Sequence, residues 1–292
     1  MASTDRPTGA YAAIALTVIL WSSAFPAIRA ALDGFGPAEL AAGRYLVASA
    51  AFAGYALATK MPLPARRDWP RIALVGALGI AAYNLLLNAG EVTVAAGTAA
   101  LIINTVPVFA ALLSTLFLGE RLRGWGWAGI ALSFAGVAVI ALGRGDGLLL
   151  DRGALLLLAA ALAQAAQFVL QKPLSARHGA LPLTACLVWS GTLFLLPFAP
   201  AAIAQATAAP GPALAALVYL GLFPAAVAYA AWSHALAHIP VGRASAFLYL
   251  TPPLAITIAL VWPGERPDVI ALYGGAAAIA GVALLNLSGR GR

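Results

Sequence analysis

The sequence predicts an all-α polytopic membrane protein whose ten transmembrane helices form two inverted five-helix repeats. The first observation is composition, because 62% of the 292 residues are apolar and only 9% are charged, whereas a soluble chain is about one quarter charged. The second is spacing, since the apolar residues form blocks of roughly twenty, the length with which a helix crosses a hydrocarbon core of about 30 Å. Membrane strands would alternate over about ten residues, and these blocks do not alternate. The third is an internal repeat.

The apolar blocks are separated by short connections rich in proline, glycine and charged residues. The first block is too long for the apolar core of a secretory signal, so we expect it to remain in the membrane as a helix. No connection is long enough to form a soluble domain. The predicted spans cover residues 9–30, 37–59, 69–89, 95–118, 124–142, 152–172, 181–199, 212–234, 241–262 and 267–287.

The internal repeat joins residues 97–121 to residues 242–266 at a constant offset of 145 positions. Pro107 then matches Pro252, and the Gly-Glu-Arg triplet at 119–121 matches the same triplet at 264–266. Each copy holds five spans, so the second copy enters the membrane from the opposite side, as in many secondary transporters. We therefore divide one membrane domain into a first repeat over 1–143 and a second, inverted repeat over 144–292.

The orientation follows from the basic residues, which stay on the cytoplasmic side of a membrane. The side that holds both termini and the even-numbered connections carries twelve Lys and Arg residues, and the other side carries four. The count predicts that both termini are cytoplasmic in a multi-pass protein of a bacterial inner membrane.

Polar and aromatic residues in the middle of spans are the candidate substrate-binding groups, because polar groups at membrane depth are costly unless they face the bundle interior. They concentrate on spans one, three and four and on their repeat mates six, eight and nine. At the repeat offset Asn84 matches Tyr229 and Asn104 matches Tyr249, as expected if both halves line one cavity. The candidate residues are Trp21, Ser22, Phe25, Tyr83, Asn84, Asn88, Asn104, Gln164, Gln167, Phe168, Tyr229, His234 and Tyr249.

Two interpretations of these residues remain open. In one, amides and hydroxyls hold the amino and carboxyl groups of a zwitterion, while rings pack on an apolar side chain. Trp21, Asn104 and Tyr249, at similar predicted depth, would then meet in a central cavity. In the other, the same groups form interhelical hydrogen bonds, worth about 0.6 kcal/mol each on average in membranes. Pro107 and Pro252 are candidate bending points for gates, because proline removes a backbone donor and kinks a helix.

The charged and titratable groups inside or beside the spans are few. Arg44 either extends to the membrane interface or serves an anionic group. Glu91 is expected to be solvated on an outer connection, and Glu120 and Glu265 are expected to pair with their neighbouring arginines at helix ends. No carboxylate lies deep in a span, so coupling to protons, through His234 or a peripheral acid, and facilitated diffusion both remain open.

The fifth and tenth spans lack such polar groups and carry small residues instead, namely Gly126, Gly129, Ser133 and Gly136 in one and Gly274, Ala278 and Gly281 in the other. Small residues four apart let helices approach closely. These two spans are expected to pack peripherally, either within one chain or in a dimer.

The sequence contains no motif for enzymatic, metal or nucleotide chemistry. A zinc-protease helix motif, a phosphate-binding loop and a cysteine cluster are all absent from it, so we expect no enzyme, no metal and no cofactor. The basic residues lie between apolar blocks and form no patch, so we expect no nucleic-acid partner.

Three motifs carry a resemblance to a known family: Trp-Ser-Ser-Ala-Phe-Pro at 21–26, Asn-x-x-Pro at 104–107, and the doubled Gly-Glu-Arg. Over nearly its whole length the chain resembles the drug/metabolite transporter superfamily, and within it the EamA-type exporters. The resemblance implies a secondary transporter that exports amino acids, aromatic or other neutral ones among them, or related metabolites by alternating access. Its partners would be a small-molecule substrate and membrane lipid, in a monomer or weak homodimer. A passive channel and an exporter of drugs or other metabolites are the alternatives.

Overall fold

The computed structural model of the chain describes residues 7–118, 124–142, 151–175, 177–238, 247–262, 264 and 269–288. These residues are almost entirely helical and include no strand. Seven helical stretches are long and apolar enough to cross a membrane, and shorter apolar helices cover Gly124–Ile140, Phe247–Val261 and Val269–Leu285. The seven are Gly9–Leu32, Pro37–Thr59, Arg66–Glu91, Ala96–Phe117, Arg152–Ser175, Ala180–Ala208 and Gly211–Ala235. The all-α membrane class is thereby confirmed.

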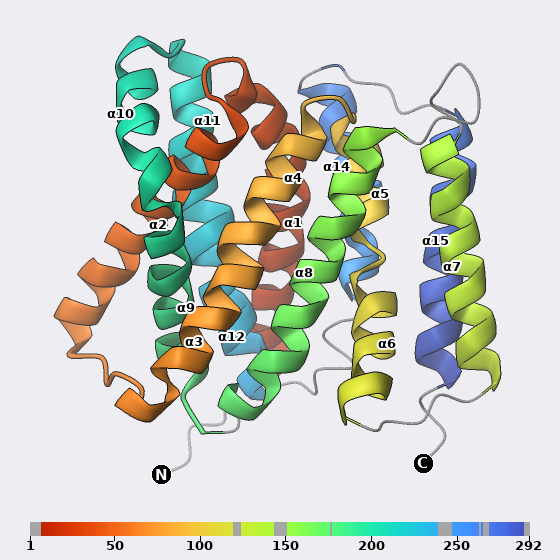
Figure 1. Cartoon of the computed structure of the whole chain (residues 1–292), viewed down its shortest axis with the longest axis horizontal. Coiled ribbons are helices and arrows are strands. Elements are labelled where there is room, and N and C mark those ends of the chain that lie inside the picture. Colours follow the sequence, from red (N-terminus) through yellow and green to blue (C-terminus); the bar gives the residue numbers. More distant parts are fainter. Residues whose placement is uncertain are drawn as a thin grey trace.

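The long helices stand side by side, and consecutive ones run in opposite directions (Figure 1). The elements up to residue 142 are α1 (Pro7–Leu32), α2 (Pro37–Thr59), η1 (Arg66–Asp68), α3 (Trp69–Gly76), η2 (Ala77–Ala82), α4 (Tyr83–Glu91), α5 (Ala96–Ile103), α6 (Val106–Leu118) and α7 (Gly124–Leu142). The later elements are α8 (Arg152–Ser175), α9 (Ala180–Leu195), η3 (Leu196–Phe198), α10 (Ala199–Ala208), α11 (Gly211–Leu222), η4 (Phe223–Val227), α12 (Ala228–His238), η5 (Phe247–Leu250), α14 (Thr251–Val261) and α15 (Val269–Ser288).

The helix α2 shows how the sequence sets helix ends in this chain. Pro37 occupies the first turn, where its missing N–H has no helical partner to lose. The preceding Gly36 is extended, and its N–H donates to Gln205 Oε1 over 3.0 Å. At the other end Lys60 adopts a left-handed conformation (φ 51°), and its N–H returns to the carbonyl of Ala56, as at many helix C-termini.

Irregular turns interrupt the helices at places related by the repeat offset. The π-helical turns η2 and η4 cover 77–82 and 223–227, and a shift of 145 carries the first onto 222–227. The predicted fourth span is broken at Asn104 and Thr105, after which Pro107 lies in the first turn of α6. Likewise the 3-10 turn η5 precedes α14, whose first turn holds Pro252. Proline lacks the backbone donor that an unbroken helix would need there.

The helices α7 and α15 pack directly on each other at one edge of the bundle (Figure 1). A Cβ at Gly129 would lie 2.6 Å from the carbonyl oxygen of Gly281, and one at Gly274 would lie 2.5 Å from that of Gly136. Backbones approach this closely only where side chains are absent. Of the two packings that the small residues allowed, the contact within one chain is therefore present in the structure.

The predicted end of the seventh span at residue 199 is wrong. The helix continues through η3 and α10 to Ala208, although Pro197 and Pro200 made a stop there plausible. Each proline lies in the first turn of a helical segment, the position that tolerates a missing N–H. Glu120 and Glu265, expected to form ion pairs at helix ends, lie outside the described residues.

Candidate functional site

The interior of the bundle holds a cluster of tyrosines, an asparagine and an arginine, which we name the tyrosine–arginine cluster. Its members are Arg44 and Tyr45 of α2, Tyr83 and Asn84 of α4, and Tyr229 of α12. Asn84 is fully buried, and its Nδ2 donates to the Tyr45 hydroxyl over 3.1 Å and to the carbonyl of Ile80 over 2.7 Å. The Tyr229 side chain lies close to those of Tyr45, Tyr83 and Arg44. The cluster therefore joins helices from both sequence halves.

Aromatic rings extend the cluster toward α1. The Trp21 ring meets the Tyr229 ring edge-on at 5.4 Å between centroids and lies 5.6 Å from that of Trp232. Trp21 Nε1 also donates over 3.2 Å to the carbonyl of Pro224, which belongs to the π-helical turn η4. Turns of this kind occur often at functional sites, and this one places its carbonyl within reach of the indole.

Three further predicted site residues contact the helices around this cluster. Ser22 is buried and bonds the carbonyl of Val18 in its own helix. Phe25 lies in the largest apolar core cluster. Asn88 is fully buried, and its Nδ2 donates over 3.0 Å to the carbonyl of Pro37 at the start of α2.

A row of glutamines follows one side of α8. Gln164 Nε2 donates to Gln167 Oε1, and Gln167 Nε2 donates to Gln171 Oε1 over 3.2 Å. Both Gln164 and Gln167 are buried. A Cβ at Gly79 would collide with the Gln167 side chain, so glycine in η2 makes room for an amide against the helix backbone.

Asn104 lies at the break between α5 and α6. Its side-chain nitrogen is buried and has no hydrogen-bond partner in the described structure. A buried amide donor without a partner is destabilising by about 1–3 kcal/mol. This nitrogen therefore does not support the interpretation in which Asn104 forms a hydrogen bond to a neighbouring helix. It is available to a ligand instead.

The remaining predicted residues lie away from the tyrosine–arginine cluster. Tyr249 packs against the apolar cluster that includes Val282, and its hydroxyl donates over 3.4 Å to the carbonyl of Val282 on α15. Among the described contacts, Trp21 thus meets Tyr229 and not Tyr249. Phe168 is 43% exposed on the outside of α8. His234 is exposed, and its ring lies 4.6 Å from that of His238.

For charged residues the structure decides between the two alternatives left open for Arg44 and corrects one expectation, that for Glu91. Arg44 does not extend to the interface, because its side chain is buried and lies over the Tyr45 ring, with Cζ 5.3 Å from the centroid. Glu91 is not solvated, because it is fully buried at the end of α4, where the Arg29 side chain reaches its backbone carbonyl. Both helices turn these residues toward the interior, and this burial could not be predicted from the residue type alone.

Sequence reasoning missed Tyr45 altogether. In the second span Arg44 was considered from the sequence, but the tyrosine beside it was not. A usable signal was present, since Arg44 and Tyr45 together place a cation and a phenol seven and eight residues beyond the proline that starts the span.

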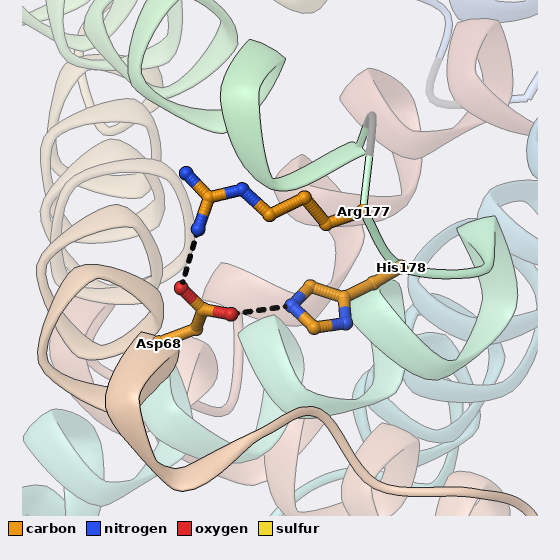
Figure 2. A network of polar contacts seen from close by, with 3 residues as sticks. All are labelled: Asp68, Arg177 and His178. Atoms are coloured by element: carbon orange, nitrogen blue, oxygen red, sulfur yellow. Dashed lines mark hydrogen bonds and ion pairs between the residues drawn. The ribbon is translucent and has the colours of Figure 1, made fainter.

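A second polar network joins the two halves at one end of the bundle. Asp68 of η1 receives a bond from Arg177 Nη1 over 3.1 Å and contacts His178 Nε2 over 2.9 Å (Figure 2). The Asp68 side chain is only 7% exposed. Because the two partners lie between α8 and α9, this network ties the start of the third span to the turn that follows α8.

The arrangement offers hydrogen bonds, one cation and ring faces, and it suits binding more than bond breaking. Among the described residues no three His, Cys, Asp or Glu side chains gather as a metal site would require. The tyrosine–arginine cluster brings hydrogen-bond donors, acceptors and aromatic rings together.

Comparison with known proteins gives the same family twice. The model of the EamA-like transporter family matches residues 8–142 and again residues 151–287. A protein of Streptantibioticus cattleyicolor described as a probable terminal-alkyne amino-acid exporter is 47% identical over 96% of this chain and 94% of its own length. The uncharacterized transporter YdfC of Bacillus subtilis is 39% identical over 93% and 89%. A crystal structure sharing 20% identity covers 96% of this chain and 97% of its own, with a TM-score of 0.63.

Proposed function

Because this chain belongs to the EamA-like transporter family of the drug/metabolite transporter superfamily, we propose that it exports amino acids or related small metabolites by alternating access. The main support is the tyrosine–arginine cluster, in which helices of both halves place polar groups and rings in the interior. The relative named as a probable terminal-alkyne amino-acid exporter points to a zwitterion with a compact apolar side chain. The protein would lie in a bacterial inner membrane.

The proposed architecture is ten spans in two inverted repeats, 1–143 and 144–292. Two observations support it. The same family model matches both stretches, and the π-helical turns and proline-led breaks recur at the repeat offset. In transporters of this plan, substrate sites lie near the midplane and use interrupted helices, as Asn104 and the tyrosine–arginine cluster would here.

Counterflow in proteoliposomes tests this function. L-propargylglycine, a terminal-alkyne amino acid, is compared with L-norvaline, which has the same carbon skeleton without the alkyne, and with L-phenylalanine. We expect saturable exchange of at least one of them, absent from protein-free liposomes. Linear, non-saturating flux would indicate a passive pore, and no flux of any amino acid would reject amino-acid export.

The topology gives a first prediction. With both termini cytoplasmic, a fusion of alkaline phosphatase to the C-terminus should be inactive, and a fusion of green fluorescent protein should be fluorescent. The physical reason is the excess of basic residues on that side. An active phosphatase fusion would place the C-terminus outside the cytoplasm and overturn the predicted combination of ten spans with two cytoplasmic termini.

The two matched prolines give a second prediction. If Pro107 and Pro252 let the interrupted helices bend during transport, replacing either with alanine should slow exchange several-fold with little change in substrate affinity. Pro253, which follows Pro252 without a match in the first repeat, provides the control substitution. Measurement of exchange rate and of substrate binding on the same preparation separates the roles, because weakened binding at an unchanged rate would mean that the prolines only shape the site.

A further inference from the structure

We propose that Arg44 binds the carboxylate of the transported amino acid, so that the substrate must carry a free carboxylate. This inference rests on the proposed function and names the group that would recognise its substrate. It starts from an unusual feature of the structure, a permanently charged side chain in the interior of the membrane domain.

Arg44 is buried, with only 5% of the residue exposed. Its Nε and Nη1 atoms are buried and have no hydrogen-bond partner among the described residues. A guanidinium cannot lose its proton in a protein, and a buried charge left without a partner costs several kcal/mol. Such a group is retained where an anion supplies the missing partner, and intramembrane arginines of this kind mark substrate paths.

The surroundings hold Arg44 in place without neutralising it. Its Cζ lies 5.3 Å from the Tyr45 ring centroid, a cation–π contact. The charge lies near enough to act on the hydroxyls of Tyr83 and Tyr229. Its backbone is fixed as well, because α2 presses on α11 so closely that a Cβ at Gly221 would lie 2.6 Å from the Arg44 carbonyl oxygen. The cation is therefore positioned beside the aromatic part of the cluster.

The facing helix α4 offers the complementary acceptors. Asn84 Oδ1 and Asn88 Oδ1 are both buried and have no hydrogen-bond partner among the described residues. They lie one helical turn apart, so both occupy the same face of α4, and α4 packs against α2. Unpaired donors on α2 and unpaired acceptors on α4 suit the carboxylate and the ammonium group of a zwitterion, respectively.

Glu91 is an acidic residue in this neighbourhood, and it also acts on the Tyr83 hydroxyl. A purely structural role for Arg44 would be to balance the Glu91 charge across the interior. That role predicts that Glu91→Gln restores whatever Arg44→Gln loses. It also predicts no difference between substrates with and without a carboxylate.

The test compares L-propargylglycine with its carboxamide, which keeps the ammonium group and the alkyne but lacks the carboxylate. In counterflow and in competition we expect the wild type to favour the acid over the amide at least tenfold. Arg44→Gln should raise the half-saturating concentration of the acid at least tenfold and abolish this preference. Arg44→Lys, which keeps the charge in a different geometry, should retain part of it. Arg66→Gln, on an exposed connection, is the matched control and should behave as wild type.

The outcomes separate the inference from the function on which it rests. If the wild type moves the amino acid but takes acid and amide equally, or if Arg44→Gln keeps the preference, the carboxylate assignment is overturned while export stands. Full rescue of Arg44→Gln by Glu91→Gln, with the preference unchanged, also overturns it. If the wild type moves no amino acid, the proposal of amino-acid export is rejected. The melting temperature in sodium propionate, compared with that in sodium chloride, then tests the anion site at Arg44 alone. A rise in melting temperature with propionate, lost in Arg44→Gln, supports the anion site, and an equal response in both proteins rejects it.

Discussion

Transport should fall at least tenfold when Trp21 or Asn104 is replaced by alanine, while the protein stays monodisperse in detergent. Tenfold corresponds to about 1.4 kcal/mol. Trp21→Ala removes the ring that contacts Tyr229 and Trp232 and the donor that bonds the Pro224 carbonyl. It therefore removes one of the links between α1 and the second half, at the proposed site. Asn104→Ala removes a buried amide nitrogen that has no hydrogen-bond partner in the described structure, so its loss costs the folded protein little.

Controls distinguish the ring from the indole donor and the site from the surface. Trp21→Phe keeps an aromatic face without the N–H and should retain more transport than Trp21→Ala. Trp125→Ala removes a tryptophan that is 70% exposed at the start of α7 and should leave transport unchanged. Normal counterflow by both Trp21→Ala and Asn104→Ala would remove the assignment of these residues to the substrate site. Loss of folding by Asn104→Ala would favour a structural role instead.

The membrane class followed from composition and block length because both reflect the solvent that surrounds the helices. The broken fourth helix was also anticipated in part, since Pro107 cannot continue an unbroken ladder of hydrogen bonds. The π-helical turns η2 and η4 were not anticipated. A π-helical turn contains about one residue more than an α-helical turn, and no local sequence pattern marks it here. That the two turns lie at matching positions of the two halves is seen only in the backbone of the structure.

The sequence predicts members of the candidate site where a polar or aromatic residue in the middle of a span is unusual. It does not predict them where helix packing decides in which direction a side chain points. Trp21, Tyr83, Asn84 and Tyr229 were chosen because such residues rarely face lipid. Arg44 has an aliphatic stem that reaches the interface in many proteins, and only the contact of α2 with α4 and α11 shows that it turns inward. The repeat offset matches Asn104 with Tyr249 by position in the sequence, but it does not tell in which direction each side chain points. In the structure the Tyr249 side chain, which lies in η5, points toward α15.

The largest effect on stability is expected at the contact of α7 with α15. Gly136 faces the carbonyl of Gly274 and the backbone nitrogen of Ala278, which lies 2.5 Å from where a Cβ would be. A backbone on the other side cannot move aside as a flexible side chain can, so Gly136→Leu must separate the two helices. Overpacking of this kind costs about 1–3 kcal/mol and sometimes more.

Gly136→Leu should therefore lower the melting temperature in detergent markedly, and Gly136→Ala should lower it less. Gly124→Leu is the matched control in the same helix, because a Cβ there has no neighbour within 4 Å. The mass on size-exclusion chromatography reports a separate property, since the contact lies within one chain and its loss leaves the oligomeric state unchanged. A melting temperature of Gly136→Leu equal to that of Gly124→Leu would show that α7 and α15 do not press on each other in the membrane protein. A change of mass without a change of melting temperature would place the glycine contact between two copies of the chain instead.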